Sequence, residues 1–563
     1  MSESNEQASP YAQRPWLQIY PAQAKPHLEY SDVSLPRLLE KSVHEFGERT
    51  ATNFFGARLT YLELLTEVNR LARILADLGV EKGDRVAIML PNCPQAVIAY
   101  YGALRLGAVV VATNPLYVER ELEFQLEDSG TETIIVLDLF YSRVKAVKER
   151  THLKHVIVTK LQEYMPFPLK FFFPLKMKRE GKVPHVEREQ GVHFWEERMQ
   201  VTQGPTPSAN VKASDLALLQ YTGGTTGVAK GAMLTHRNLV ANVLQVKEWM
   251  LDAEPGKEKM LGVLPFFHVY GMTVAMNLAV TLGAELIILP KFEIKQALKA
   301  INKYQPTFFP GAPTMYVAIN TYPEVTKYKI SSIRSCISGS APLPVEVQEK
   351  FEQLTGGKLV EGYGLTEASP VTHSNPLAGM RKTGTIGLPL PDTECKIVDP
   401  ATFAEVAVGE IGELAVKGPQ VMAGYWNRQK ATAAAIHDGW LLTGDMATMD
   451  EDGYFRIADR KKDLIIAGGF NIYPREIEEV LYQHPAVQEA AVIGVPDDYR
   501  GETVKAFLVL RPGEQANAEE ITKYCRSKLA AYKVPRLIEF REELPKTIVG
   551  KVLKRQLRQE EKD

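Results

Sequence analysis

Strands that alternate with helices constrain the fold of this chain more than any other feature. Residues 60–63 are spaced as a capping box that starts a helix, and Gly79 is expected to end it. The pattern after it predicts a strand at 85–90, a helix at 96–106 and strands at 108–112, 134–137 and 155–158. Strands connected through helices favour a largely parallel α/β sheet.

The length of 563 residues predicts more than one domain. Residues 265–367 repeat the strand–helix alternation without repeating the sequence, and the character changes after about residue 389. Short strands with turn signals are then expected at 394–398, 412–417 and 454–457. The tail should hold a helix that starts at Pro474, strands at 487–495 and 504–510, and a helix from about residue 518. We therefore expect an α/β chain with two α/β sheets, a small β-rich subdomain and a small α+β C-terminal domain.

Charge and cysteine content exclude several classes of protein. A net charge of −2 gives no general basic field that would attract nucleic acid. The polar residues 1–10 contain no apolar core, so no secretory signal is expected. No CxxC pair is present, which favours free thiols in a reducing cytoplasm over zinc ligands or disulfides. The cysteines are Cys93, Cys336, Cys395 and Cys525.

Residues 261–290 form an apolar stretch that could be mistaken for a membrane span. His268, Asn277, Glu285 and several glycines interrupt it. We therefore expect a buried strand, loop and helix there.

A loop at residues 221–231, of sequence YTGGTTGVAKG, predicts a phosphate site. Its glycines let backbone N–H groups approach an anion, and its threonine hydroxyls can donate hydrogen bonds or bind Mg²⁺. Lys230 adds a positive charge for phosphate oxygens. Lys230 follows Ala229 and precedes Gly231, so the register does not fit a Walker A loop. The alternative is a glycine-rich surface turn.

Residues 166–178, of sequence PFPLKFFFPLKMK, cluster aromatic and basic side chains without acids. We expect a surface loop that packs through residues 171–173. The alternative is a patch that lies on an anionic membrane surface. The prolines argue against one continuous amphipathic helix.

Four further segments carry polar side chains in turn-rich settings. Residues 361–367 read EGYGLTE, residues 438–445 read DGWLLTGD, and residues 545–551 read PKTIVGK. Residues 459–463 read DRKKD between two β segments, which is consistent with a solvated hairpin or with a hinge between domains.

In order and wording, these motifs resemble the adenylate-forming superfamily of acyl-CoA synthetases, luciferases and peptide-synthetase adenylation domains. The resemblance runs from about residue 30 to the C-terminus, and residues 438–466 are most similar to bacterial fatty acyl-CoA ligases. It implies a large N-terminal domain, residues 1–459, and a small mobile C-terminal domain, residues 460–563. It also implies ATP, Mg²⁺ and coenzyme A, a fatty acid as substrate, and a protein that can form a homodimer.

The resemblance assigns ATP binding to Thr222, Gly223, Gly224, Thr225, Thr226, Gly227, Lys230, Gly339, Ala341, Gly362, Tyr363, Thr366, Asp445 and Arg460. The loop would hold the β- and γ-phosphates, Tyr363 would stack on adenine, and Asp445 with Arg460 would hold the ribose. Thr222 and Glu367 match Mg²⁺ ligands. A core tyrosine and a turn-capping aspartate are the structural alternatives for Tyr363 and Asp445.

Catalysis is expected from Lys551, His268, Thr366 and Glu367. Lys551 matches the lysine that meets the α-phosphate and the acyl carboxylate, although most lysines are surface charges. His268 matches a histidine between the ATP and acyl sites, although a lone His in an apolar stretch is more often a core residue.

Lys462 matches a hinge position, where other members have Asp. Rotation there would exchange Lys551 for a CoA-binding face around Gly468 and Gly469. Ile466 departs from the family, since some relatives have a lysine there, which leaves any nucleotide contact from this position in doubt.

An apolar acyl pocket is expected near His268. Its candidate lining residues, for which buried core is an equal interpretation, are Val269, Met272, Thr273, Gly311, Ala312 and Pro313. The resemblance thus implies a cytoplasmic long-chain-fatty-acid–CoA ligase, and the alternative interpretation of residues 166–178 adds peripheral contact at the inner face of the membrane. The alternatives are a ligase for medium-chain or aryl acids, an enzyme that loads a carrier protein, and a non-catalytic nucleotide or acyl binder.

Overall fold

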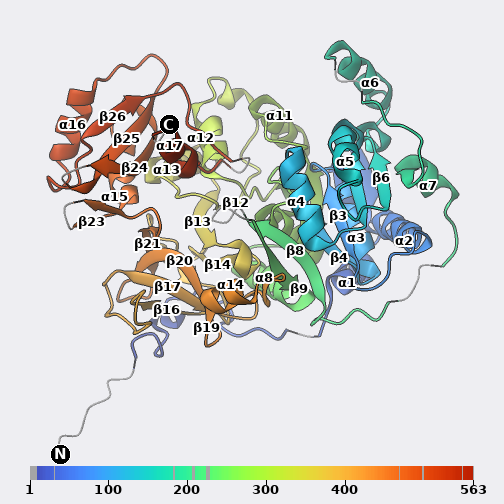
Figure 1. Cartoon of the computed structure of the whole chain (residues 1–563), viewed down its shortest axis with the longest axis horizontal. Coiled ribbons are helices and arrows are strands. Elements are labelled where there is room, and N and C mark those ends of the chain that lie inside the picture. Colours follow the sequence, from blue (N-terminus) through green and yellow to red (C-terminus); the bar gives the residue numbers. More distant parts are fainter. Residues whose placement is uncertain are drawn as a thin grey trace, which may run out of the picture.

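The computed structural model describes residues 9–30, 32–181, 184–205, 209–222, 229–467, 470–497, 500–547 and 550–561. Figure 1 shows the first α/β sheet at one end of the molecule and the C-terminal part at the other. A β-rich subdomain lies below the C-terminal part in this view. The predicted α/β class and order of subdomains are confirmed.

The first sheet contains eight strands in the order β18-β9-β8-β4-β3-β5-β6-β7. The strands from β8 to β7 are parallel, whereas β9 and β18 are antiparallel additions at one edge. The strands are β3 (Arg85–Met89), β4 (Val109–Ala112), β5 (Thr133–Leu137), β6 (His155–Thr159), β7 (Val192–Phe194), β8 (Leu216–Thr222), β9 (Lys230–Thr235) and β18 (Gly424–Tyr425).

Alternate side chains of β3 enter two different cores. Val86 and Ile88 pack in the core that includes α2 and α3, whereas Ala87 and Met89 pack in the core that includes α4 and α5. The sheet is therefore buried on both faces, as a parallel sheet requires. The helices are α2 (Tyr61–Asp77), α3 (Pro94–Arg105), α4 (Glu119–Ser129) and α5 (Tyr141–Lys148).

Helix α2 begins as predicted. The Thr60 hydroxyl accepts from the Glu63 amide at 3.1 Å, and the Thr60 amide donates to Glu63 Oε2 at 2.7 Å. Gly79 follows the helix with φ of 84°, a left-handed conformation that glycine adopts without strain.

The second α/β sheet consists of two four-stranded sections, β10-β11-β1-β2 and β12-β13-β14-β15. Phe308 joins them through bridges to Met260 and Ser335. The strands are β1 (Thr50–Phe54), β2 (Ala57–Thr60), β10 (Lys259–Gly262), β11 (Glu285–Ile288), β12 (Ser335–Ser338), β13 (Lys358–Gly364), β14 (Val371–Ser374) and β15 (Leu388–Pro389). The associated helices are α1 (Leu35–Phe46), α8 (His236–Trp249), α9 (Val269–Gly271), α10 (Leu278–Leu282), α11 (Ile294–Tyr304), α12 (Pro313–Thr321) and α13 (Val345–Thr355).

Residues 261–290 form strand β10, a buried helical segment and strand β11, as predicted. None of the helices in the described part of the chain is long and apolar enough to cross a bilayer.

The β-rich subdomain is antiparallel and follows the predicted strands closely. It contains β16 (Glu394–Val398), β17 (Gly412–Lys417), β19 (Ile436–His437), β20 (Trp440–Met449) and β21 (Phe455–Arg460), with α14 (Gln429–Ala435) beside it.

The C-terminal part forms another five-stranded sheet with its own apolar clusters. Its strands are β22 (Ile465–Ala467), β23 (Phe470–Ile472), β24 (Val487–Asp497), β25 (Gly501–Leu510) and β26 (Leu537–Phe540). Its helices are α15 (Pro474–Tyr482), α16 (Ala518–Arg526) and α17 (Lys554–Glu560).

The expectation of a packed loop at residues 166–178 is wrong. Residues Leu169–Arg179 form helix α6, with Pro174 inside it, ahead of α7 (Trp195–Val201). Pro174 removes one backbone donor, but α6 is exposed and water can satisfy the freed carbonyl. Phe171 and Phe172 are 65% and 61% exposed instead of packed.

The charged run at 459–463 is also more than a solvated hairpin. Asp459 and Asp463 are buried. Asp463 Oδ1 pairs with Arg558 Nη1 at 2.7 Å, and Asp459 Oδ2 accepts from the Arg475 amide at 2.7 Å. These contacts fix the connection between β21 and β22 to the C-terminal part.

Candidate active site

A cavity of about 3440 Å³ lies between the N-terminal body and the C-terminal part, and it gathers the predicted site residues of the described chain. Thr222, Lys230, His268, Gly339, Ala341, Gly362, Tyr363, Thr366, Glu367, Asp445, Arg460, Lys462 and Lys551 all line it. Gly223, Gly224, Thr225, Thr226, Gly227, Gly468 and Gly469 lie outside the described residues.

The β8–β9 hairpin holds the two ends of the phosphate loop. Thr222 and Lys230 are directly paired across the two strands. Beneath them, the Tyr221 hydroxyl donates to Asp128 Oδ2 at 2.8 Å, and Arg428 also pairs with Asp128. The strand that leads into the loop is therefore fixed to α4 and to the segment after β18.

Tyr425 joins the phosphate-loop lysine to the predicted metal-binding carboxylate. Lys230 Nζ lies 5.1 Å from the centre of the Tyr425 ring, and the Tyr425 hydroxyl donates to Glu367 Oε1 at 2.7 Å. Strand β18 positions Tyr425, because Tyr425 pairs with Ala232 of β9. Tyr425 was not predicted from the sequence, because it lies in a two-residue strand outside the motifs.

The donor set at this end of the cavity fits Mg²⁺ that arrives with a nucleotide. Thr222 offers a hydroxyl. Glu367 accepts from Tyr425 at Oε1, so its Oε2 is available to a metal ion. Mg²⁺ commonly binds through one or two carboxylates while phosphates and water complete its coordination. In the described part of the chain no group of three or more His, Cys, Asp or Glu could form an all-protein metal site.

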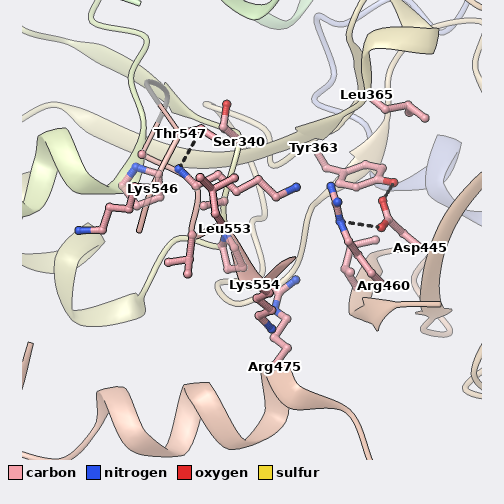
Figure 2. Close-up of a pocket in the computed structure, with 18 of the residues that line it drawn as sticks. Ser340, Tyr363, Leu365, Asp445, Arg460, Arg475, Lys546, Thr547, Leu553 and Lys554 are labelled. Carbon is pink, nitrogen blue, oxygen red and sulfur yellow. Dashed lines mark hydrogen bonds and ion pairs between the residues drawn. The ribbon is translucent and has the colours of Figure 1, made fainter. Parts of the chain in front are cut away.

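Tyr363, Asp445 and Arg460 form a connected group in the cavity (Figure 2). The Tyr363 hydroxyl donates to Asp445 Oδ2 at 2.6 Å, and Arg460 Nε lies 3.6 Å from Asp445 Oδ1. Asp445 and Arg460 are paired residues of β20 and β21. A carboxylate has about four acceptor sites, so Asp445 can still accept hydrogen bonds from a ligand.

Glycines in this region allow close packing beneath the cavity wall. A Cβ on Gly339 would lie 2.9 Å from the Tyr270 ring, and one on Gly362 would lie 2.9 Å from the Ile337 side chain. These glycines therefore have a structural reason to be small, whatever they contact in the cavity.

His268 is held as a neutral hydrogen-bond donor. Its Nδ1 accepts from the Tyr270 amide at 3.2 Å. Burial, with the nearby charge of Lys551, lowers the pKa of His268 to about 4. A neutral imidazole that accepts at Nδ1 has its proton on Nε2, so this ring can donate to an anionic oxygen. Two buried amides support the same turn, since Asn92 Oδ1 accepts from Phe266 N at 2.8 Å and Gln220 Nε2 donates to Phe267 O at 3.1 Å.

Lys551 reaches the same cavity from the C-terminal part. Its amide donates to Thr547 Oγ1 at 3.1 Å, within a tight turn (Figure 2). Burial and the positive charge of Arg460 lower the pKa of Lys551 to about 7. Neither Lys230 nor Lys551 forms an ion pair with a carboxylate of the described residues. Cations without carboxylate partners in a cavity are suited to an anionic ligand.

Lys462 lies in the turn between β21 and β22, as a hinge residue would, and burial lowers its pKa. Its role as a hinge stays a prediction. Ile466 is 54% exposed and does not line the cavity, so the structure gives no nucleotide contact at this position.

The candidate acyl residues divide into two groups. Val269 and Pro313 line the cavity. Met272, Thr273, Gly311 and Ala312 are buried and do not line it, and the Thr273 hydroxyl donates to Ser369 O at 2.8 Å. For these four residues, the core interpretation describes the structure better.

Two contacts across the cavity were not expected from the sequence. Arg475 of α15 lies with its Nη2 3.6 Å from Oε1 of Glu361 in β13, and both side chains are buried. A Cβ on Gly550 would lie 2.5 Å from Thr314 Oγ1 of α12. Both contacts join the C-terminal part to the N-terminal body.

Comparison with known proteins agrees with this geometry. Residues 39–426 match the family model of the AMP-binding enzymes, and residues 476–551 match that of the AMP-binding enzyme C-terminal domain. The chain is 51% identical to a long-chain-fatty-acid–CoA ligase of Bacillus subtilis (strain 168) over 98% of both chains. It is 43% identical to a protein of the same description from Salmonella typhimurium, over 97% of this chain and 98% of the relative.

Solved structures with the same fold include ligand complexes. A crystal structure of the anthranilate CoA ligase AuaEII with anthranoyl-AMP has a TM-score of 0.84 at 28% identity, and the match covers 95% of this chain and 98% of that one. A crystal structure of ATP-bound MatB from Rhodopseudomonas palustris has a TM-score of 0.83 at 30% identity, and covers 95% and 99%.

Proposed function

Because this chain belongs to the AMP-binding enzyme family, we propose that it joins a long-chain fatty acid to coenzyme A at the expense of ATP. In the first half-reaction, a carboxylate oxygen of the acid attacks the α-phosphorus of ATP, and pyrophosphate leaves. In the second half-reaction, the thiolate of coenzyme A attacks the acyl carbonyl, and AMP leaves. Two relatives that are 51% and 43% identical to this chain over nearly their whole length are described as long-chain-fatty-acid–CoA ligases, which favours a long-chain acid.

The observation that supports this proposal most is the placement of Lys230 and Lys551 on one cavity from separate parts of the chain, each without a carboxylate partner among the described residues. The first half-reaction brings an anion to a polyanion, so positive charge must be supplied where negative charge develops. Lys230 would hold the departing phosphates, and Lys551 would meet the α-phosphate and the acyl carboxylate. His268 would donate from Nε2 to one of the same oxygens.

The remaining residues would position the nucleotide. Tyr363 would lie against adenine, with Gly339, Ala341 and Gly362 as the neighbouring wall, and Asp445 with Arg460 would hold the ribose. Thr366 would contact the α-phosphate. Thr222 and Glu367 would hold Mg²⁺, which would supply charge to the phosphates when bound.

We further propose that the chain divides into residues 1–459 and 460–563, and that rotation at Lys462 presents Gly468 and Gly469 to coenzyme A. The arrangement described above, with Lys551 in the cavity, suits adenylation. A homodimer is a separate prediction, which sedimentation velocity would test.

One assay tests the proposed reaction. The purified protein is supplied with ATP, Mg²⁺ and a panel of short, medium-chain, long-chain and aryl acids, with and without coenzyme A. We expect AMP, pyrophosphate and thioester with long-chain acids. Release of no AMP or pyrophosphate with any acid would refute an enzymatic function.

The same panel separates the alternative functions. Highest activity with a medium-chain or aryl acid would assign the substrate to that class. The aryl alternative is included because the fold is similar to that of AuaEII, an anthranilate CoA ligase. Pyrophosphate exchange without thioester would favour loading of a carrier protein.

A further inference from the structure

Helix α6 presents large apolar side chains to solvent. Phe171, Phe172 and Leu175 of the helix are 65%, 61% and 57% exposed, and Phe167, which precedes the helix, is 83% exposed. In Figure 1 the helix projects from the first α/β sheet, away from the body of the molecule. Soluble proteins seldom expose so many large apolar residues together, and such patches commonly mark interaction surfaces.

The exposed residues share one face of the helix. At about 100° per residue, Phe171, Phe172 and Leu175 fall on one side, and Phe173 with Met177 falls on the other. Phe173 is half-buried and packs against the core. We name the side with Phe171, Phe172 and Leu175 the outer face of α6. Its apolar residues are directed away from the core, opposite to an ordinary surface helix.

The charges of α6 have one sign. Lys170, Lys176, Lys178 and Arg179 lie in the helix, and the sequence Leu169–Arg179 contains no acid. Lys170 and Lys176 have distant carboxylate partners, Glu196 at 3.5 Å and Glu180 at 3.8 Å. Lys178 and Arg179 have no ion-pair partner among the described residues, and they continue the outer face one turn beyond Leu175.

We propose that the outer face of α6 docks on an anionic lipid bilayer. Aromatic and leucine side chains insert at the boundary of headgroups and acyl chains, and adjacent cations pair with anionic headgroups. A protein groove would accept the apolar residues, but a helix that also carries four cations and no acid is better matched to a surface of uniform negative charge. The proposal commits to the bilayer, and a protein partner is an outcome of the test.

Docking would also serve the proposed function, on which this part of the inference rests. Long-chain fatty acids partition into bilayers, so an enzyme on that surface meets its substrate at a raised local concentration. The docking itself does not depend on the reaction, and vesicle binding is measured without ATP or coenzyme A.

The experiment is co-sedimentation of the full chain with vesicles of neutral phosphatidylcholine or of phosphatidylcholine mixed with phosphatidylglycerol. We expect binding to the anionic vesicles, and weaker binding as salt is raised above about 0.1 M, where the screening length falls below about 10 Å. Binding to neither vesicle, or equal binding to both, would overturn the proposal.

Two variants locate the contact. Phe171→Ser with Phe172→Ser should lower the partition coefficient on anionic vesicles by at least about tenfold. Lys178→Gln with Arg179→Gln should lower it by several fold and reduce the dependence on salt. The matched control is Leu537→Ser in β26, which removes an apolar residue that is 44% exposed at the other end of the molecule (Figure 1).

Folding and function are tested separately from docking. Because these side chains are exposed, the variants should keep the wild-type melting temperature and the wild-type rate with a short, water-soluble acid. If the wild type released no AMP or pyrophosphate with any acid of the panel, the proposed reaction would be refuted and the vesicle result would still stand. Unchanged vesicle binding by the phenylalanine variant would refute the assignment of α6, and a change in oligomeric state by that variant would assign the face to a second copy of the chain.

Discussion

At the scale of single residues, the burial of Lys551 makes its charge depend on pH near neutrality. Its pKa is lowered to about 7, and the proposed first half-reaction needs the cationic form. A lysine is cationic below its pKa, so kcat/KM for ATP in pyrophosphate release should fall as the pH rises through about 7. Because kcat/KM reports the free enzyme, a later rise of the pKa on ATP binding does not obscure this limb.

Two lysine variants check the assignment of that limb. Lys551→Arg should remove the alkaline fall or move it upward, even at a lower maximal rate, since arginine stays charged. Lys546→Arg, on the same turn but paired with Glu489 at 2.5 Å, should leave it in place. If kcat/KM of Lys551→Arg still fell as the pH rises through about 7, that fall would have to come from the titration of another group. His268, with a pKa of about 4, should contribute no limb near neutral pH.

Tyr425 offers a second test at the residue scale. Tyr425→Phe removes the hydroxyl that donates to Glu367 at 2.7 Å but keeps the ring beside Lys230. Loss of a partner behind a metal ligand commonly costs about 10- to 100-fold in metal affinity. We expect half-maximal pyrophosphate exchange to need roughly tenfold more Mg²⁺. Tyr454→Phe, which loses a 2.6 Å hydrogen bond to Met380 O away from the cavity, is the control, and an equal shift there would contradict the role of Tyr425.

At the scale of elements, the turn that carries Lys551 fits against α12 only because residue 550 is glycine. A Cβ there would lie 2.5 Å from Thr314 Oγ1, and φ is 78°. Gly550→Ala should slow the adenylation half-reaction by about tenfold or more, because it combines a clash with about 1 kcal/mol of backbone strain. Thioester formation from added acyl-adenylate should change much less.

Two further variants separate the clash from the strain. Gly513→Ala has a similar φ of 86° with no atom within 4 Å of its Cβ, so it should leave adenylation near the wild-type rate. Thr314→Ala should restore part of the rate to Gly550→Ala, because it removes the nearest atom. Failure of this rescue would exclude the proposed contact.

The elements themselves were largely predictable, because their signals are local. The strands of the first sheet and the capped helix α2 depend on short patterns of apolar residues, caps and turns. Helix α6 was not predicted, because its prolines were taken to break a helix. The helix is solvent-exposed, so it tolerates the one carbonyl that Pro174 leaves without a backbone donor. The hairpin of β1 and β2 joins the second sheet rather than the first, which no local pattern indicates.

At the scale of the whole molecule, the site residues that lie in sequence motifs could be predicted. The contacts between segments that are distant in the sequence could not. Tyr363 and Asp445 lie in separate motifs, and only the fold shows that they share a hydrogen bond. Arg475 and Glu361 likewise come from the C-terminal part and from β13. Contacts of this kind depend on how the domains are oriented, which a sequence pattern does not encode.

The Arg475–Glu361 pair should stabilise the orientation in which Lys551 enters the cavity. Both side chains are buried, and burial raises the pKa of Glu361 to about 7 although Arg475 opposes the rise. Removing one partner of a buried pair leaves an uncompensated group, so Arg475→Gln should slow adenylation by about tenfold, or ~1.4 kcal/mol. Thioester formation from added acyl-adenylate should slow by no more than about twofold, since rotation would already have separated the pair.

The matched control is Arg511→Gln, which removes another ion pair between the same two parts of the chain. Arg511 Nη2 lies 3.9 Å from Glu346 Oε2, and both side chains are largely exposed, so little change is expected. Addition of Glu361→Gln to Arg475→Gln should recover part of the adenylation rate, because no buried charge is then unpaired. Equal slowing of both half-reactions by Arg475→Gln would mean that the pair supports the fold in general. Selective slowing with recovery in the double variant would mean that it sets the balance between the two orientations.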